Sequence, residues 1–190
     1  MPTPDRTSRA AIVEAGRAIL EKGGPAGLTM QAVADHVGVR APSLYKRVPN
    51  RDGLLVLVAE ATAHDLADQL EASDGSLASL ARVYRSFARR HPEGFRLMFT
   101  VEGAAAAMGR ASKPVLQATG ALVGTDAALD AARLVTAWAT GFVNMELSGS
   151  FRFEGDLDRA FEYGLGRLIA GLQADGMPSV SAEQRDAAPK

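Results

Sequence analysis

The chain of 190 residues is 47% hydrophobic and 23% charged, which is ordinary for a globular protein and excludes disorder over most of its length. It has no cysteine, which excludes disulfides, thiolate zinc sites and cysteine nucleophiles and fits a reducing cytoplasm. No apolar run approaches the roughly 18 residues of a membrane span, and residues 1–9 have no signal-peptide core behind them. We therefore expect a cytoplasmic protein with no membrane partner.

The net charge of −1 conceals an asymmetry along the chain. Residues 1–55 carry eight Lys or Arg residues against five acids, whereas the remainder carries thirteen against seventeen. A basic end on an acidic body is typical of a protein that touches a polyanion with one end. A charged surface helix gives the same pattern, so charge alone leaves both interpretations open.

Thirty-five alanines, with comparatively few Val, Ile and Thr, predict an all-α chain of about nine helices. The first is expected over residues 7–22, ended by Gly23-Gly24-Pro25. Thr29 is a suitable N-cap for a second helix that runs to about Val37. Further helices are expected over 42–48, 51–71, 76–90, 92–99, 103–123 with a break near Lys113-Pro114, 125–149 and 156–174, followed by a flexible tail over 177–190.

Residues 29–48 have the pattern of a helix-turn-helix. Gly38 tolerates the left-handed backbone that a tight turn requires, and Val33, Leu44 and Val48 are spaced to face inward. The outward residues of the second helix are small at its start and basic and aromatic beyond it. A DNA major groove admits such a helix, although a helical hairpin that packs on a larger body would share the pattern. The outward residues are Arg40, Ala41, Pro42, Ser43, Tyr45, Lys46 and Arg47.

This region resembles the TetR/AcrR repressors. The resemblance rests on Leu28-Thr29-Met30, Val33-Ala34, Val37-Gly38-Val39 and the stretch from Leu44-Tyr45-Lys46-Arg47-Val48 to Gly53-Leu54-Leu55. Arg47 stands where that family usually has His and adds a cation, and Val48 stands where it usually has Phe. The resemblance implies a three-helix DNA-binding domain over 1–54 and a larger helical ligand-binding and dimerisation domain over 55–176.

The resemblance also implies roles on operator DNA. Thr29 caps its helix and can donate its hydroxyl to a phosphate, and Arg40 can bond both O6 and N7 of a guanine. Tyr45 and Lys46 are expected to hold the DNA backbone, as is the start of the helix at Arg51. The expected DNA-binding residues are Thr29, Arg40, Ala41, Pro42, Ser43, Tyr45, Lys46, Arg47 and Arg51.

Large soft or aromatic side chains gather in the middle of the chain. They are either core or the lining of a pocket that repacks around an apolar ligand. No Lys or Arg falls on their stripes, which favours a neutral, mostly apolar small-molecule effector, while ring faces leave a cationic one open. Segments around Phe95 and Gly141 resemble one TetR subgroup, but Thr140 stands where many members have His. The expected pocket residues are Tyr84, Phe87, Met98, Phe99, Met108, Trp138, Phe142 and Met145.

The predicted helix over 125–149 carries two apolar stripes, and the one over 156–174 carries a single stripe with Gly164 and Gly171, which permit close helix approach. A helix that is apolar on two sides is covered on two sides, either by the monomer core or by a twofold copy that completes a four-helix bundle. The second interpretation makes the protein a homodimer. The expected interface residues are Ala132, Ala139, Val143, Phe161, Leu165, Leu168 and Leu172.

Catalysis is not expected. His36, His64 and His91 lie on separate segments, and the sequence contains no phosphate-binding glycine motif and no nucleophile elbow. We therefore expect no metal and no cofactor. The sequence predicts a TetR-type repressor that binds palindromic operator DNA as a dimer and is released by a small apolar ligand. The alternative is a dimeric DNA-binding regulator without such a ligand, controlled by a protein partner or by its own abundance.

Overall fold

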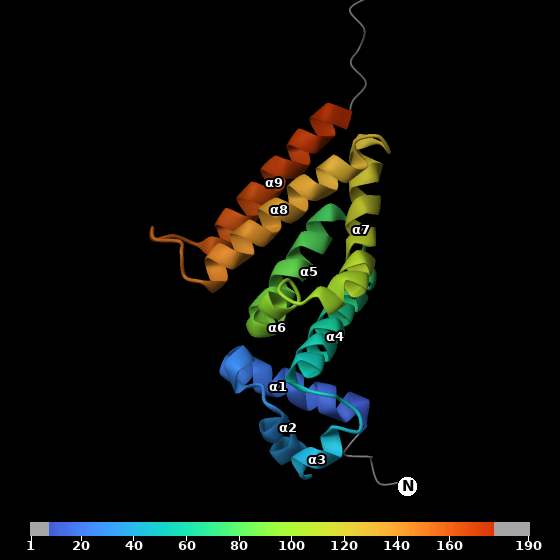
Figure 1. Cartoon of the computed structure of the whole chain (residues 1–190). Helices are drawn as coiled ribbons and strands as arrows, with labels where there is room; N and C mark the ends of the chain where they lie inside the picture. The colour runs from blue at the N-terminus through green and yellow to red at the C-terminus, as the bar shows by residue number, and fades with distance from the viewer. Residues whose placement is uncertain (1–7, 177–190) are drawn as a thin grey trace, which may run out of the picture.

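The computed structural model describes residues 8–176, and over these residues the chain is all-helical, as predicted (Figure 1). Nine α-helices and one 3₁₀ helix are present in this range, with no strand. The predicted tail over 177–190 lies outside the described residues. The helices are α1 (Arg9–Gly27), α2 (Met30–Val37), α3 (Ala41–Leu44), α4 (Arg51–Glu71), α5 (Leu77–Arg90), α6 (Pro92–Leu97), η1 (Glu102–Ala104), α7 (Ala105–Val123), α8 (Ala128–Leu147) and α9 (Leu157–Gly176).

The first helix continues past its predicted end but breaks where the glycines predict. Gly24 has φ 63° and ψ −175°, so the backbone kinks there and one further turn extends to Gly27. A left-handed φ costs glycine little because it has no Cβ. The predicted break was therefore placed correctly, and the turn that follows it was missed.

The predicted break in α7 at Lys113-Pro114 is wrong. Pro114 lies inside a continuous helix from Ala105 to Val123, although its ring removes one backbone hydrogen bond. Buried Ala111 and Thr119 hold the helix on either side of the proline, and the Thr119 hydroxyl donates to the Ala128 carbonyl at 2.9 Å. Tertiary packing thus outweighs the local cost of the proline.

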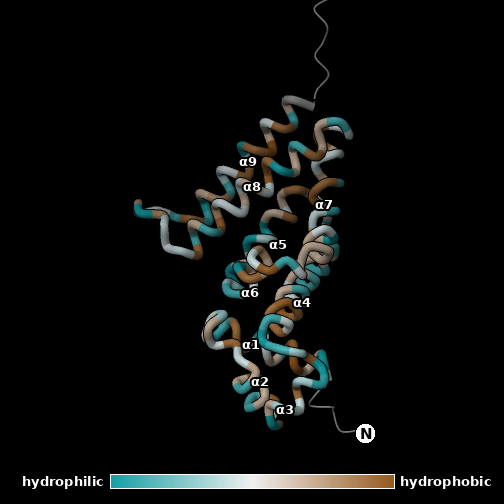
Figure 2. The backbone as a smooth tube through the Cα atoms, in the orientation of Figure 1, coloured by the Kyte–Doolittle hydropathy of each residue, from teal (hydrophilic) through white to brown (hydrophobic). Residues whose placement is uncertain are grey.

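The helices form a long molecule with α1, α2 and α3 at one end (Figure 1). Helix α4 runs from that end into the body, where α7 packs along it. Helices α8 and α9 lie side by side on the far side of α5, and Figure 2 shows hydrophobic and hydrophilic residues alternating along both. None of the described helices is long and apolar enough to cross a membrane.

One hydrophobic core joins the two ends of the molecule. It runs without interruption from Ile12 and Leu44 at the small end, through Val58 on α4, to Phe95 and Val143 in the body. The expected domain boundary at 54/55 falls inside α4, so both parts share this helix. A movement of α4 therefore displaces residues both at the small end and in the body.

Candidate DNA interface and internal cavity

The helix-turn-helix is built by local capping and a glycine turn. The Thr29 hydroxyl accepts a hydrogen bond from the Ala32 backbone N at 3.1 Å and so caps α2. Gly38 ends α2 in the left-handed conformation, with φ 75° and ψ 40°. Leu44 and Val48 are fully buried beneath the second helix. These contacts fix the angle at which α3 leaves the turn.

Helix α3 is a single turn, shorter than the predicted 42–48. The Leu44 carbonyl accepts from both the Arg47 N at 2.8 Å and the Val48 N at 2.9 Å, so the chain continues as a tight turn. Residues 45–47 form a tight turn that directly continues α3. Their side chains therefore lie at the same end of the molecule as the first residues of α3.

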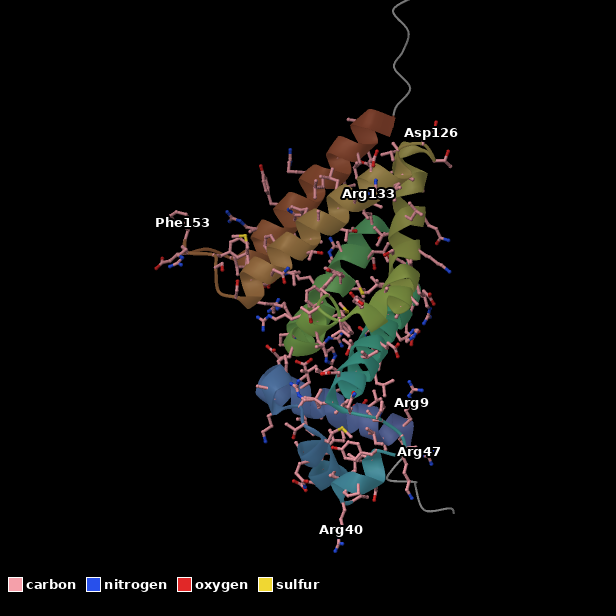
Figure 3. The ribbon with its side chains drawn as sticks, viewed as in Figure 1. Arg9, Arg40, Arg47, Asp126, Arg133 and Phe153 are labelled. Atoms are coloured by element: carbon pink, nitrogen blue, oxygen red, sulfur yellow. The ribbon has the colours of Figure 1, made fainter. Side chains whose placement is uncertain are left out.

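The outer face of this turn carries cations. Arg40, Lys46 and Arg47 are exposed, as are Tyr45 and Pro42, whereas Ala41 and Ser43 are half-buried. Figure 3 shows Arg40 and Arg47 projecting away from the body. No residue in the range 8–176 hydrogen-bonds the Arg40 guanidinium, so its donors are available to a ligand.

The side chain of Arg51 forms hydrogen bonds within the protein. Its Nε donates to the Leu28 carbonyl at 2.9 Å, and its Nη2 donates to the Pro25 carbonyl. The guanidinium therefore fastens the start of α4 to the segment between α1 and α2. Asn50 caps α4 by accepting from the Gly53 N at 2.8 Å. The side chain of Arg51 thus positions the helix-turn-helix, while the DNA contact expected of the N–H groups at the start of α4 stays a prediction.

Arg9 was not selected from the sequence. It is the first residue of α1 and is exposed, and in Figure 3 it extends to the same side of the small end as Arg47. Its position in a polar terminal stretch gave no signal, because only the fold brings the start of α1 to this end.

A cavity of about 70 Å³ lies between α4, α5, α7 and α8. None of its lining side chains is charged. Tyr84 supplies a hydroxyl that lies 2.8 Å from the Thr140 hydroxyl, and burial raises the pKa of Tyr84 to about 12 although that hydrogen bond lowers it. The lining residues are Leu66, Leu70, Leu77, Leu80, Ala81, Tyr84, Phe99, Met108, Ala111, Ser112, Val115, Val135, Thr136 and Ala139.

Two family comparisons cover most of the chain. Residues 12–58 match the family described as bacterial regulatory proteins, tetR family. Residues 77–168 match the family described as tetracyclin repressor-like, C-terminal domain. The chain belongs to the TetR family. Members of this family are transcriptional regulators and not enzymes.

Two curated relatives come from mycobacteria. An uncharacterized HTH-type transcriptional regulator of Mycobacterium tuberculosis, Rv0681, is 28% identical over 183 residues, covering 90% of this chain and 84% of the relative. The HTH-type transcriptional regulator Mb1846 of Mycobacterium bovis is 34% identical over 99 residues, covering 47% of this chain and 42% of the relative. The first of these likenesses extends through the helix-turn-helix end and the body.

Solved structures share the TetR fold. A protein of unknown function from Rhodococcus sp. RHA1 superposes with a TM-score of 0.78 at 21% identity, covering 91% of this chain and all of that chain. A variant of TetR from Acinetobacter baumannii AYE, solved in complex with minocycline, has a TM-score of 0.67 at 24% identity and covers 90% and 99%. At these identities the likeness establishes the fold.

The expected TetR pocket residues fall into three groups. Tyr84, Phe99 and Met108 line the cavity. Phe87 and Met98 are buried in the main core and do not reach it. The remaining three lie elsewhere: Trp138 and Phe142 pack on Phe161, and Met145 is exposed. The leucines and alanines that complete the lining were missed, because small and medium aliphatic residues look like core in a sequence.

The expectation that no cation lies on the aromatic stripes is wrong. The Arg85 guanidinium lies 4.7 Å from the ring centroid of Phe161 and 5.5 Å from that of Phe142. It also pairs with Glu146 at 2.7 Å and Asp158 at 2.8 Å. Two acids neutralise this cation outside the cavity, so it does not make the cavity basic.

The expected dimer residues are mostly interior. Phe161 is only 1% exposed and packs with Leu165 beneath α9, while Ala139, Val143 and Leu172 are also buried within the single chain. These side chains cannot reach a partner, and this corrects the predicted interface. Only Ala132 and Leu168 are half-exposed. The large apolar residues that these two helices expose are Leu129, Leu134 and Met145 on α8 and Tyr163 on α9.

Proposed function

We propose that this TetR-family regulator is a cytoplasmic repressor that binds palindromic operator DNA as a homodimer. A small, mostly apolar molecule that enters the cavity would release it. The observation that carries the proposal is the exposed cationic turn around α3, which stands at the far end of the molecule from α8 and α9.

The charge and shape of this turn support contact with the major groove. Arg40 lies at the start of α3 with its donors available, where the first residues of a recognition helix reach base edges. Lys46, Arg47 and Arg9 are exposed on the same end and suit phosphate contacts. We assign Arg40 to a guanine edge and Lys46 to the backbone.

The exposed side of α8 and α9 supports a twofold interface. Leu134 is 50% exposed and Met145 is 44% exposed, and the small residues Ala137 and Gly141 lie between them on the same side of α8. Tyr163 adds an exposed ring on α9. The α8–α9 pairs of two protomers would bury these residues in a four-helix bundle.

The cavity supports a small neutral effector. Its lining is uncharged and its volume is about 70 Å³, well below the roughly 150 Å³ of an engineered cavity that binds benzene. A larger molecule must move the wall, and Phe99, which is 48% exposed, stands at its edge. If the effector binds the protein with the moved wall about 1–3 kcal/mol more tightly than the operator-binding form, it would weaken operator binding roughly 5- to 150-fold.

Selection of bound DNA from a random pool tests the proposal. We expect a palindrome whose half-sites are centred about 34–36 Å apart, one helical turn of DNA, because each protomer presents one α3. The stoichiometry should be one dimer per site, measured by sedimentation of the complex. Recovery of no preferred sequence, or of a single half-site bound by a monomer, would contradict it.

The small cavity also favours a second candidate, a dimeric DNA-binding regulator without a small-molecule ligand. A screen of neutral apolar compounds by operator release distinguishes the two. The Ala139→Leu variant fills the cavity. If the effector binds there, compounds that release the wild-type protein from its operator should not release this variant. Control by a protein partner or by abundance predicts that no compound releases it.

A further inference from the structure

Glu21 on α1 holds the start of α6 in the body. Its Oε1 accepts a hydrogen bond from the Gly94 backbone N at 2.8 Å, and its Oε2 accepts one from the Glu93 backbone N at 3.1 Å. Helix α6 has no cap of its own, because the side chain of His91 makes none and Pro92 has no N–H. We call this pair of hydrogen bonds the Glu21 clamp. A carboxylate of the DNA-binding end thus completes a helix of the body.

The clamp leaves no free space at the start of α6. A Cβ added to Gly94 would lie 3.0 Å from the Glu21 Oε1 and 3.1 Å from the Thr62 Cγ2. Such distances are tighter than ordinary van der Waals contact, so α6 is seated closely against both α1 and α4. A shift of α6 must therefore push on α1 or break the clamp.

The other side of α6 reaches the cavity wall. Phe95 is fully buried, and its ring centroid lies 5.2 Å from that of Tyr84 and 5.2 Å from that of Phe99, both edge-on. Tyr84 and Phe99 line the cavity. One turn of helix thus carries the clamp on one side and an aromatic contact with the cavity wall on the other.

We propose that Glu21 is the positioning residue that transmits the state of the cavity to the DNA-binding end. The proposal rests on the proposed function. A molecule too large for about 70 Å³ displaces Phe99, Phe95 follows because its ring is packed on both sides, and α6 moves with it. The clamp then forces α1 to follow, and α1 shares its core with α2 and α3. Arg17 ties α1 to Asp65 on α4 and does not restrain α6.

The test uses a side chain as the occupant of the cavity, since it needs no identified effector. Ala111→Leu adds three carbons to the cavity wall, and Ala121→Leu adds the same group on the exposed side of the same helix. Operator affinity is measured on the selected palindrome for each variant, with Glu21 intact and as Glu21→Ala. We expect Ala111→Leu to weaken binding about 5-fold or more with Glu21 intact, and by less than about 2-fold with Glu21→Ala. Ala121→Leu should leave affinity unchanged in both backgrounds.

Two further variants separate coupling from a general structural role. Glu14→Ala removes an exposed carboxylate from the same helix and should preserve the full response. Glu21→Gln keeps one acceptor oxygen and should restore part of the response that Glu21→Ala loses. Amide exchange should accelerate at Glu93 and Gly94 in Glu21→Ala while the core of α4 around Val58 stays protected.

The outcomes are distinguishable. An equal response to Ala111→Leu with and without Glu21 overturns the clamp and leaves the proposed function intact. No response with Glu21 intact contradicts control through the cavity, and the clamp with it. If Glu21→Ala does not fold, Glu21→Gln decides: faster exchange at Gly94, which means a weakened clamp, together with a full response to Ala111→Leu overturns the proposal.

Discussion

The indole ring of Trp138 lies where a side chain on residue 164 would have to be. A Cβ added to Gly164 would be 2.6 Å from the Trp138 Cζ2, closer than real Cβ atoms approach. The face of the ring stacks on Phe161, also on α9, whose centroid is 5.1 Å away. Helices α8 and α9 therefore approach each other closely only because residue 164 has no side chain.

Gly164→Ala should destabilise the protein by about 1–3 kcal/mol, the usual cost of overpacking a core. Urea unfolding followed by the fluorescence of Trp138, the single tryptophan, measures it. Gly166→Ala is the matched control, because a Cβ there meets nothing within 4 Å. That change should stabilise the helix by about 0.5–1 kcal/mol. Equal effects of the two changes on the free energy of unfolding would mean that the Trp138 indole can move aside without loss of stability.

Arg40→Ala should weaken operator binding by about 1–3 kcal/mol and relax the preference at one base pair per half-site. The reason is the loss of donors that the structure leaves available at the start of α3. Lys46→Ala is the contrast: it should weaken binding to all sequences alike and flatten the dependence on salt. Repeated selection with each variant measures both effects. An unchanged motif for Arg40→Ala would move the base contact elsewhere.

Leu134→Glu should give monomers, because it places a charge in the proposed twofold seam of α8 and α9. Sedimentation velocity reports the change. Leu116→Glu replaces another exposed leucine, on α7, and should leave the dimer intact. Phe161→Glu should instead unfold the chain, since Phe161 is interior. A dimer that survives Leu134→Glu would place the interface on another surface.

The ion pair between Arg17 and Asp65 should make stability depend on acid pH. Burial raises the pKa of Asp65, but hydrogen bonds from Gln69 and Arg17 outweigh it and hold the pKa below its usual value. The folded state therefore binds this proton less readily than the unfolded state, so the contribution is present above about pH 4 and is lost below it. Asp65→Asn should cost about 0.2–1 kcal/mol at pH 7. The difference from wild type should shrink as the pH falls to about 3, measured by urea unfolding; a constant difference would assign the effect to packing.

The features of the fold that were predicted correctly depend on local sequence signals. The caps Thr29 and Asn50 and the turn at Gly38 act within three or four residues, so their effects were predictable. Pro114 was misjudged because its effect depends on the helices that pack on α7. The length of α3 was overestimated because a helix and the tight turn after Leu44 have similar spacing.

The body was harder to predict because its sites depend on tertiary contacts. The sequence predicted that α8 is covered on two sides and that α9 has one apolar stripe, but it could not show that α5 covers Phe161 and Leu165 of that stripe. Arg85 meets Glu146 across 61 residues of chain, and no periodicity signals such a pair. Leu66 and Leu80 read as ordinary core, and only the packing of four helices reveals a space between them.

The uninterrupted core has a consequence for how this protein can be divided. Val58 lies four residues beyond the expected boundary, yet it packs directly beneath Gly16 of α1. A fragment that stops at residue 54 would truncate α4 in its first turn and lose Val58, the side chain that packs beneath Gly16. Chimaeras that exchange the first three helices between family members should therefore keep the α4 residues that pack against α1, such as Val58, matched to the incoming α1.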